Sequence, residues 1–166
     1  SSFKDNIFYP KMSKNFSERD TVELIKETVI SSIKTRLLSD VPVGTFLSGG
    51  IDSSIITAVA SKMISNLNTI CVGFQDEYDP YHGKSDESKQ ARDFADFLGT
   101  VHTNINVKAN DFRDMLPQFI HSAGQPFAVS SGLGILAVSK KAREMGLKVL
   151  LSGDGADEAF GGYSWY

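Results

Sequence analysis

Two short runs of serine, glycine and aspartate hold the residue types in this sequence that are best suited to chemistry. The first reads Ser-Gly-Gly-Ile-Asp-Ser over residues 48–53, after a short apolar stretch and before a predicted helix. Adjacent glycines let backbone N–H groups approach a ligand closely, and a helix start adds unpaired N–H donors and a positive dipole end. The run therefore predicts a cradle for phosphate or pyrophosphate.

This cradle differs from the two commonest nucleotide-binding loops. No Gly-Lys-Ser/Thr follows residue 50, which excludes the lysine-bearing mononucleotide loop. No Gly-x-Gly-x-x-Gly is present either, which excludes the dinucleotide fingerprint.

The second run reads Ser-Gly-Asp-Gly-Ala-Asp-Glu over residues 152–158 and adds carboxylates. Carboxylates repel phosphates unless a cation stands between them, and Mg²⁺ prefers one or two carboxylates together with phosphate oxygens. Asp52 and Asp157 are therefore the candidate metal ligands. Such a metal would neutralise charge developing on a leaving pyrophosphate. The alternative is that Asp154 and Asp157 merely cap the next helix.

Strands and helices are predicted to alternate around these two runs. Apolar stretches predict strands at residues 43–47, 69–74, 101–107 and 148–151. Apolar residues at helical spacing predict helices at 17–38, from about 53 to 63, at 86–98, at 110–120 and at 132–145. This alternation predicts an α/β fold, a doubly wound and mostly parallel sheet flanked by helices.

Three local features of the helices can be tested directly. The first helix, with Ser17 as its N-cap, has an apolar stripe that is expected to cover one face of the sheet. Asn110 or Asp111 is expected to cap the helix at 110–120. Pro117 is expected to break that helix, because proline is costly in a helix interior.

Both Leu-Ser-Gly turns, at residues 47–49 and 151–153, follow predicted strands. In doubly wound sheets, ligands bind beyond the carboxyl ends of the strands, where the strand order reverses. If the two strands are central and adjacent, their turns face one cleft and form a single active site.

Length and composition limit the classes of function. With 166 residues the chain fits one domain, predicted at 17–166 after an irregular lead-in at 1–16. A net charge of −3 gives no reason to expect nucleic acid or an anionic membrane as partner, and no apolar run approaches the roughly 20 residues that span a bilayer. No signal peptide is recognisable, so a cytoplasmic protein is expected. The single cysteine, Cys71, is predicted to lie in the core, and His82, His102 and His121 are predicted to be structural or solvent-facing.

The two runs together resemble a known family. The first looks like the pyrophosphate-binding loop of the N-type ATP pyrophosphatases. The second, continued by Phe-Gly-Gly-Tyr at 160–163, resembles the synthetase domain of the glutamine-hydrolysing asparagine synthetases. Supporting similarity extends from about residue 16 to residue 166, and it implies an adenine nucleotide alpha hydrolase-like fold.

This resemblance implies a role for each matching residue. The β- and γ-phosphates of ATP would be held by residues of the first run, namely Ser48, Gly49, Gly50, Asp52 and Ser53. Leu47 and Val72 would contact adenosine, while Ser152 and Gly153 would lie against the ribose and the α-phosphate. Asp52 and Asp157 would bind Mg²⁺. Asp154 stands where the family commonly has glutamate, a position linked to forming the acyl-adenylate.

The implied reaction has two steps. A substrate carboxylate, the side chain of aspartate in the named family, attacks the α-phosphate of ATP and expels pyrophosphate. Ammonia then attacks the acyl-adenylate, giving the amide and AMP. The ammonia would come from a glutaminase domain, which this chain lacks, so an isolated synthetase domain shortened at its C-terminal end is expected.

Some alternatives stay open at this point. Relatives usually carry one or two acids near residues 124–126, where this chain has Gly-Gln-Pro. A carboxylate other than aspartate, amidated in polysaccharide or secondary-metabolite synthesis, is therefore a second candidate acceptor. A nucleotide-binding fragment without catalysis is another alternative, and a homodimer is compatible with the sequence.

Overall fold

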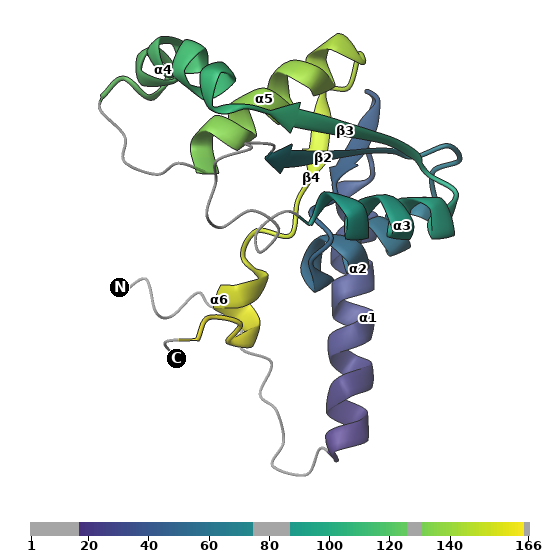
Figure 1. Ribbon diagram of the computed structural model, residues 1–166. Helices are drawn as coiled ribbons and strands as arrows, with labels where there is room; N and C mark the ends of the chain where they lie inside the picture. Colours follow the sequence, from purple (N-terminus) through teal and green to yellow (C-terminus); the bar gives the residue numbers. More distant parts are fainter. Residues whose placement is uncertain (1–16, 75–86, 126–130, 165–166) are drawn as a thin grey trace.

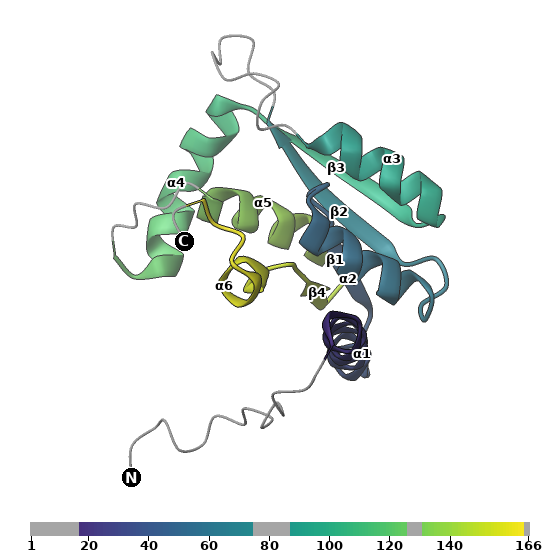
Figure 2. The ribbon, with the colours of Figure 1, turned by 90° about the horizontal axis from the view of Figure 1, so that it is seen from below.

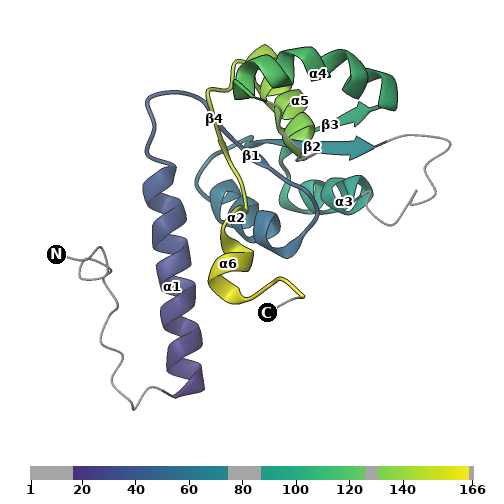
Figure 3. The same cartoon turned by 90° about the vertical axis from the view of Figure 1, so that its left-hand side faces the viewer.

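The computed structural model describes residues 17–74, 87–125 and 131–164. Within these ranges a parallel sheet forms the middle layer, with the strand order β3-β2-β1-β4 (Figure 1). The strands are β1 (Val43–Phe46), β2 (Asn68–Phe74), β3 (Val101–Val107) and β4 (Val149–Leu151). Helices α2 (Ile51–Ser61) and α3 (Ser88–Leu98) lie on one side of the sheet and α5 (Ser131–Glu144) on the other, where α4 (Ala109–Ala123) packs against α5 (Figure 3). The predicted doubly wound α/β fold is confirmed.

Alternate residues of the inner strands supply two separate cores. Leu47 and Cys71 pack with Ala91 of α3 on one face of the sheet. Ile70 packs with Val138 of α5 on the other face. Cys71 is only 1% exposed, so its predicted place in the core is confirmed. Because successive side chains of a strand point to opposite faces, this sheet needs apolar residues at almost every inner position.

The strand order reverses between β1 and β4. From β1 the chain moves to β2 and then β3, and afterwards it returns to β4 on the other side of β1. The register pairs Val43 with Val149 and Thr45 with Leu151, so both strands end at the same edge of the sheet. The predicted adjacency is confirmed, but β4 lies at the margin of the described sheet rather than at its centre.

Helix α1 (Glu18–Arg36) begins as predicted but does not cover the sheet. Ser17 caps it in a reciprocal capping box with Asp20. Ile33 is its only buried residue, whereas Val22 is 58% exposed and Ile25 is 43% exposed. Helices α2 and α3 already cover that face, so α1 contacts α2 and lies at the margin of the molecule (Figure 2). The expectation that α1 covers a sheet face was wrong.

Helix α4 corrects two local expectations. Its N-cap is Lys108 rather than Asn110 or Asp111, and Asp111 instead accepts a hydrogen bond from the Lys108 N–H at 2.8 Å. Pro117 lies inside a continuous helix. No residue of α4 is buried, so the carbonyl four residues before Pro117, which loses its helical partner, can bind water instead.

Some expectations lie outside the described residues. They include the lead-in at 1–16 and His82. Among the residues that are described, no helix combines the length and the apolar character that crossing a bilayer requires.

Candidate active site

The loop between β1 and α2 has the backbone geometry of an anion cradle. Gly49 has φ +92°, and a Cβ there would lie 2.8 Å from the carbonyl oxygen of Glu87, so only glycine fits. Helix α2 begins at Ile51, two residues before the predicted start, and Gly50 is its N-cap without a side-chain hydrogen bond. The first N–H groups of α2 therefore remain available to a ligand.

Two serine hydroxyls hold the shape of this loop. The oxygens Ser48 Oγ and Ser53 Oγ lie 3.0 Å apart, and Ser53 Oγ also accepts the Ser48 N–H at 3.2 Å. The Gly50 N–H donates to Ser48 Oγ at 3.3 Å. Ser53 is only 4% exposed, so it supports the loop from inside, while Ser48 lies at the surface of the cavities described below.

The loop after β4 touches the loop after β1. A Cβ on Gly153 would lie 2.9 Å from both Asp52 Cβ and Ser53 N. The two loops are thus in van der Waals contact, and glycine at position 153 permits this approach. This contact follows from the pairing of β1 with β4, which brings both loops to one edge of the sheet.

The carboxylates of the second loop do not cap a helix. The N-cap of the short helix α6 (Ala156–Phe160) is Gly155, which makes no side-chain capping bond. Asp154 Oδ2 instead accepts the Ser152 hydroxyl at 2.8 Å. The alternative interpretation of Asp154 and Asp157 as capping residues is therefore not observed.

A small cavity of about 230 Å³ lies between the two loops. Seven of the predicted site residues line it, namely Ser48, Gly50, Asp52, Ser53, Gly153, Asp154 and Asp157. At its edge the Tyr163 hydroxyl donates to Glu158 Oε1 at 2.7 Å. That hydrogen bond lowers the pKa of Glu158, which lines the cavity together with Asp52, Asp154 and Asp157.

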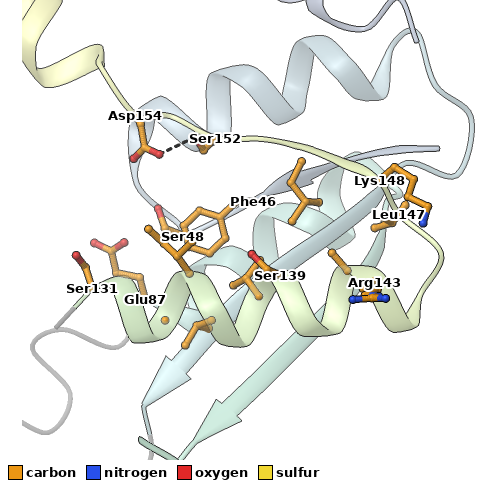
Figure 4. Close-up of a pocket in the computed structure, with 16 residues that line it drawn as sticks. Phe46, Ser48, Glu87, Ser131, Ser139, Arg143, Leu147, Lys148, Ser152 and Asp154 are labelled. Atoms are coloured by element: carbon orange, nitrogen blue, oxygen red, sulfur yellow. Dashed lines mark hydrogen bonds between the residues drawn. The ribbon is translucent and has the colours of Figure 1, made fainter. Parts of the chain in front are cut away.

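A larger cavity of about 790 Å³ opens between α5 and the sheet (Figure 4). Apolar side chains from the sheet and α5 form much of its wall, among them Phe46, Val72, Ile135, Val138 and Leu150. Polar groups gather where the strands end, namely Ser48, Glu87, Ser131, Ser152 and Asp154. Phe46, Ser48 and Asp154 line both cavities, which therefore belong to one site.

Two predicted residues, Leu47 and Gly49, line neither cavity, and Gly49 only shapes the turn. Leu47 is fully buried and packs against α3, so its side chain lines neither cavity. The preceding residue, Phe46, lines both, and sequence reasoning missed it. Phe46 and Val72 lie on the same face of the sheet, since Phe46 is paired with Ile70. Alternation within the predicted strands, combined with the choice of Val72, could have selected Phe46.

The residues fit a magnesium ion that is shared with a nucleotide. Asp52 and Asp157 lie in the first turns of different helices, α2 and α6, and line the same small cavity. Within the described ranges no group of three or more His, Cys, Asp or Glu side chains could hold a metal by itself. Mg²⁺ commonly takes one or two carboxylates and completes its shell with water and phosphate oxygens, so the pair suits it.

The comparisons with known proteins agree with this fold. In fold, the chain resembles an NH3-dependent NAD synthetase from Campylobacter jejuni, with a TM-score of 0.53 at 16% identity, over 86% of this chain and 60% of that one. The fold is thus adenine nucleotide alpha hydrolase-like. The family model described as asparagine synthase matches residues 24–166. The chain belongs to the asparagine synthase family.

Its relatives are considerably longer proteins. A glutamine-hydrolysing asparagine synthetase 1 from Bacillus subtilis is 36% identical over 149 residues, which cover 90% of this chain and 22% of that protein. A Methanocaldococcus jannaschii protein, provisionally named glutamine-hydrolysing asparagine synthetase 2, is 35% identical over 156 residues, or 93% of this chain and 29% of that protein. The chain thus spans between a fifth and a third of the length of these relatives.

Proposed function

We propose that this site adenylates a carboxylate with ATP and that the acyl-adenylate is then converted into an amide. Aspartate is the proposed acceptor, ammonia derived from glutamine is the nucleophile, and asparagine, AMP and pyrophosphate are the products. The contact of Gly153 with Asp52 and Ser53 is the observation that carries this proposal, because it joins an anion cradle to a carboxylate loop.

The first loop would hold the pyrophosphate part of ATP. The first N–H groups of α2 would meet an anion at the positive end of the helix dipole. The Ser48 hydroxyl can turn from Ser53 to a phosphate oxygen, while Gly49 shapes the turn. The α2 N–H groups are fixed by the helix before the reaction, so they can stabilise charge on the leaving group without further reorganisation.

The remaining groups would orient the nucleotide and the acceptor. Phe46 and Val72 offer apolar surface for the adenine in the larger cavity. Ser152 and Gly153 lie between the two cavities, where the ribose and the α-phosphate would be placed. Asp154 lines both cavities, which suits a role beside the acyl-adenylate. In-line placement of the carboxylate against the α-phosphate is the main contribution that such a site can make.

Asp52 and Asp157 would hold Mg²⁺ against the departing phosphates. The ion would supply neutralisation of the negative charge that develops on pyrophosphate. We also propose that a separate glutaminase domain supplies the ammonia and that the protein acts in the cytoplasm. The names of the relatives, which describe glutamine-hydrolysing enzymes, support the first of these proposals.

The test is ATP–pyrophosphate exchange by the full-length protein against a panel of carboxylates. Exchange that requires aspartate supports the proposal, and exchange with a different carboxylate would replace aspartate as the acceptor. ATP binding without exchange for any carboxylate would instead support a nucleotide-binding role and contradict the proposed ligase.

A further inference from the structure

Glu87 brings a carboxylate to the large cavity that the proposed reaction does not yet use. It is the N-cap residue of α3, but its side chain makes no capping hydrogen bond. The side chain lines the large cavity together with Ser48 and Asp154, and Figure 4 shows all three beside the same opening. This carboxylate is therefore placed at the site rather than used to begin a helix.

Among the described residues, the surroundings of Glu87 contain an anion cradle but no ion-pair partner. Its Oε2 lies 3.9 Å from the position that a Cβ on Gly50 would occupy. The ion pairs of the described residues involve other acids, and none joins Glu87 to a lysine, arginine or histidine. A carboxylate this close to bound phosphates would weaken their binding unless a cation reduces the repulsion.

That cation is distinct from the proposed magnesium ion. Asp52 and Asp157 line the small cavity, which Glu87 does not reach, and neither of them lines the large one. The proposed reaction offers another cation, because two of its reactants, the amino-acid acceptor and the ammonia, carry an ammonium group at neutral pH. These are the α-ammonium group of an amino-acid acceptor and ammonium itself, the protonated form of the nucleophile.

We propose that Glu87 is a specificity-determining residue that binds a substrate ammonium group in the large cavity. This inference rests on the proposed function, since it assumes that the cavity holds the reactants of amide formation. The carboxylate would accept charge-assisted hydrogen bonds from the ammonium. A neutral glutamine at the same position can accept only weaker hydrogen bonds from it. The two possible sources of the ammonium group are separated by experiment.

The experiment uses Glu87→Gln in the full-length protein, with Asp93→Asn as the matched control. Asp93 is exposed on the same helix and lines neither cavity, so its variant removes one negative charge outside the site. ATP–pyrophosphate exchange is measured without ammonia, with aspartate and with succinate, which is aspartate lacking its ammonium group. Amide formation is then measured at increasing ammonia concentration.

An acceptor ammonium predicts that Glu87→Gln raises the KM for aspartate by about tenfold or more, with the KM for succinate and for ATP within about twofold of the unaltered protein. If Glu87 instead binds ammonium, the protonated form of the nucleophile, Glu87→Gln should leave exchange unchanged and raise the KM for ammonia by about tenfold. Asp93→Asn should change none of these values by more than about twofold, the variation expected for an exposed charge.

Two results would overturn the assignment while leaving the ligase intact. In the first, Glu87→Gln changes neither the KM for aspartate nor the KM for ammonia. In the second, it changes only the dependence on ATP or Mg²⁺, which would assign Glu87 to the phosphates. If the unaltered protein shows no exchange with any carboxylate, the proposed function fails and this inference fails with it.

Discussion

Replacing Gly153 with alanine tests the contact that joins the two loops. The added Cβ would lie 2.9 Å from Asp52 Cβ and from the backbone nitrogen of Ser53, whereas ordinary van der Waals contact begins at 3.4 Å. The loops must therefore separate by about 0.5 Å, the difference between these two distances. Because Ser53 N belongs to the backbone, a side-chain rotation cannot relieve the clash.

This separation should affect both stability and nucleotide binding. Overpacking of this kind costs about 1–3 kcal/mol, so the free energy of unfolding should fall by that amount in urea denaturation followed by circular dichroism. A displacement of the Asp52 loop by half an ångström should also raise the Kd for ATP by about tenfold, measured by calorimetry on the full-length protein.

Gly50→Ala is the matched control for stability. Its Cβ would meet Ser48 Oγ at 3.4 Å and Glu87 Oε2 at 3.9 Å, which are ordinary contacts, and Gly50 has φ −70°, which alanine adopts easily. The free energy of unfolding should change by less than about 1 kcal/mol. The reasoning is refuted if Gly153→Ala is as stable as the unaltered chain and binds ATP equally well.

Three further predictions concern groups around the site and the core. Thr45 and Thr57 share a buried hydrogen bond of 3.0 Å between their hydroxyls, so either single change to valine should cost about 1–3 kcal/mol in urea unfolding, and the double change less than the sum of the two. Burial, followed by the nearby positive charge of an arginine, lowers the pKa of His102 below its ordinary value of 6.5. The unfolded chain therefore binds a proton first as pH falls through that value, so stability should decrease between pH 7.5 and 5.5, and His102→Gln should reduce this decrease. Removing the Tyr163 hydroxyl with Tyr163→Phe should raise the pKa of Glu158 toward its ordinary value, and NMR titration of the Glu158 carboxyl measures this change.

The order of the elements could be predicted from the sequence because the chemistry of each strand is local. Continuous apolar runs bounded by polar turns identify buried parallel strands, and the repeated Leu-Ser-Gly turns mark the two strand ends that matter. Whether these ends meet depends on the strand order, which the sequence does not encode locally. The pairing of Thr45 with Leu151 supplies that missing step.

The difference between Leu47 and Phe46 shows why side-chain direction was harder to predict. Both residues are apolar and precede the glycine turn, so composition does not distinguish them. What each side chain contacts depends on which helix covers its face of the sheet, and α3 covers the face to which Leu47 points. The position of Glu87 at the cavity likewise depends on how α3 follows β2, although its place at a helix start was visible in the sequence.

Tertiary context also overrides two local rules. The apolar stripe of α1 predicts burial, but α2 and α3 already occupy the nearest face of the sheet, so Val22 remains exposed. Pro117 predicts a helix break, yet α4 lies on the surface, where water can satisfy the carbonyl that loses its partner. In both cases the sequence pattern is read correctly, and the neighbouring elements decide the outcome.

The central claim is that the two loops form one magnesium-dependent adenylation site. Its most direct test is aspartate-dependent ATP–pyrophosphate exchange by the full-length protein at increasing Mg²⁺ concentration, for Asp52→Asn, Asp157→Asn and the control Asp93→Asn. Both site variants should lose exchange by at least about 100-fold, although Asp52 and Asp157 lie in different helices, and Asp93→Asn should retain it. Exchange that persists in Asp52→Asn and in Asp157→Asn, with unchanged dependence on Mg²⁺, would contradict the account.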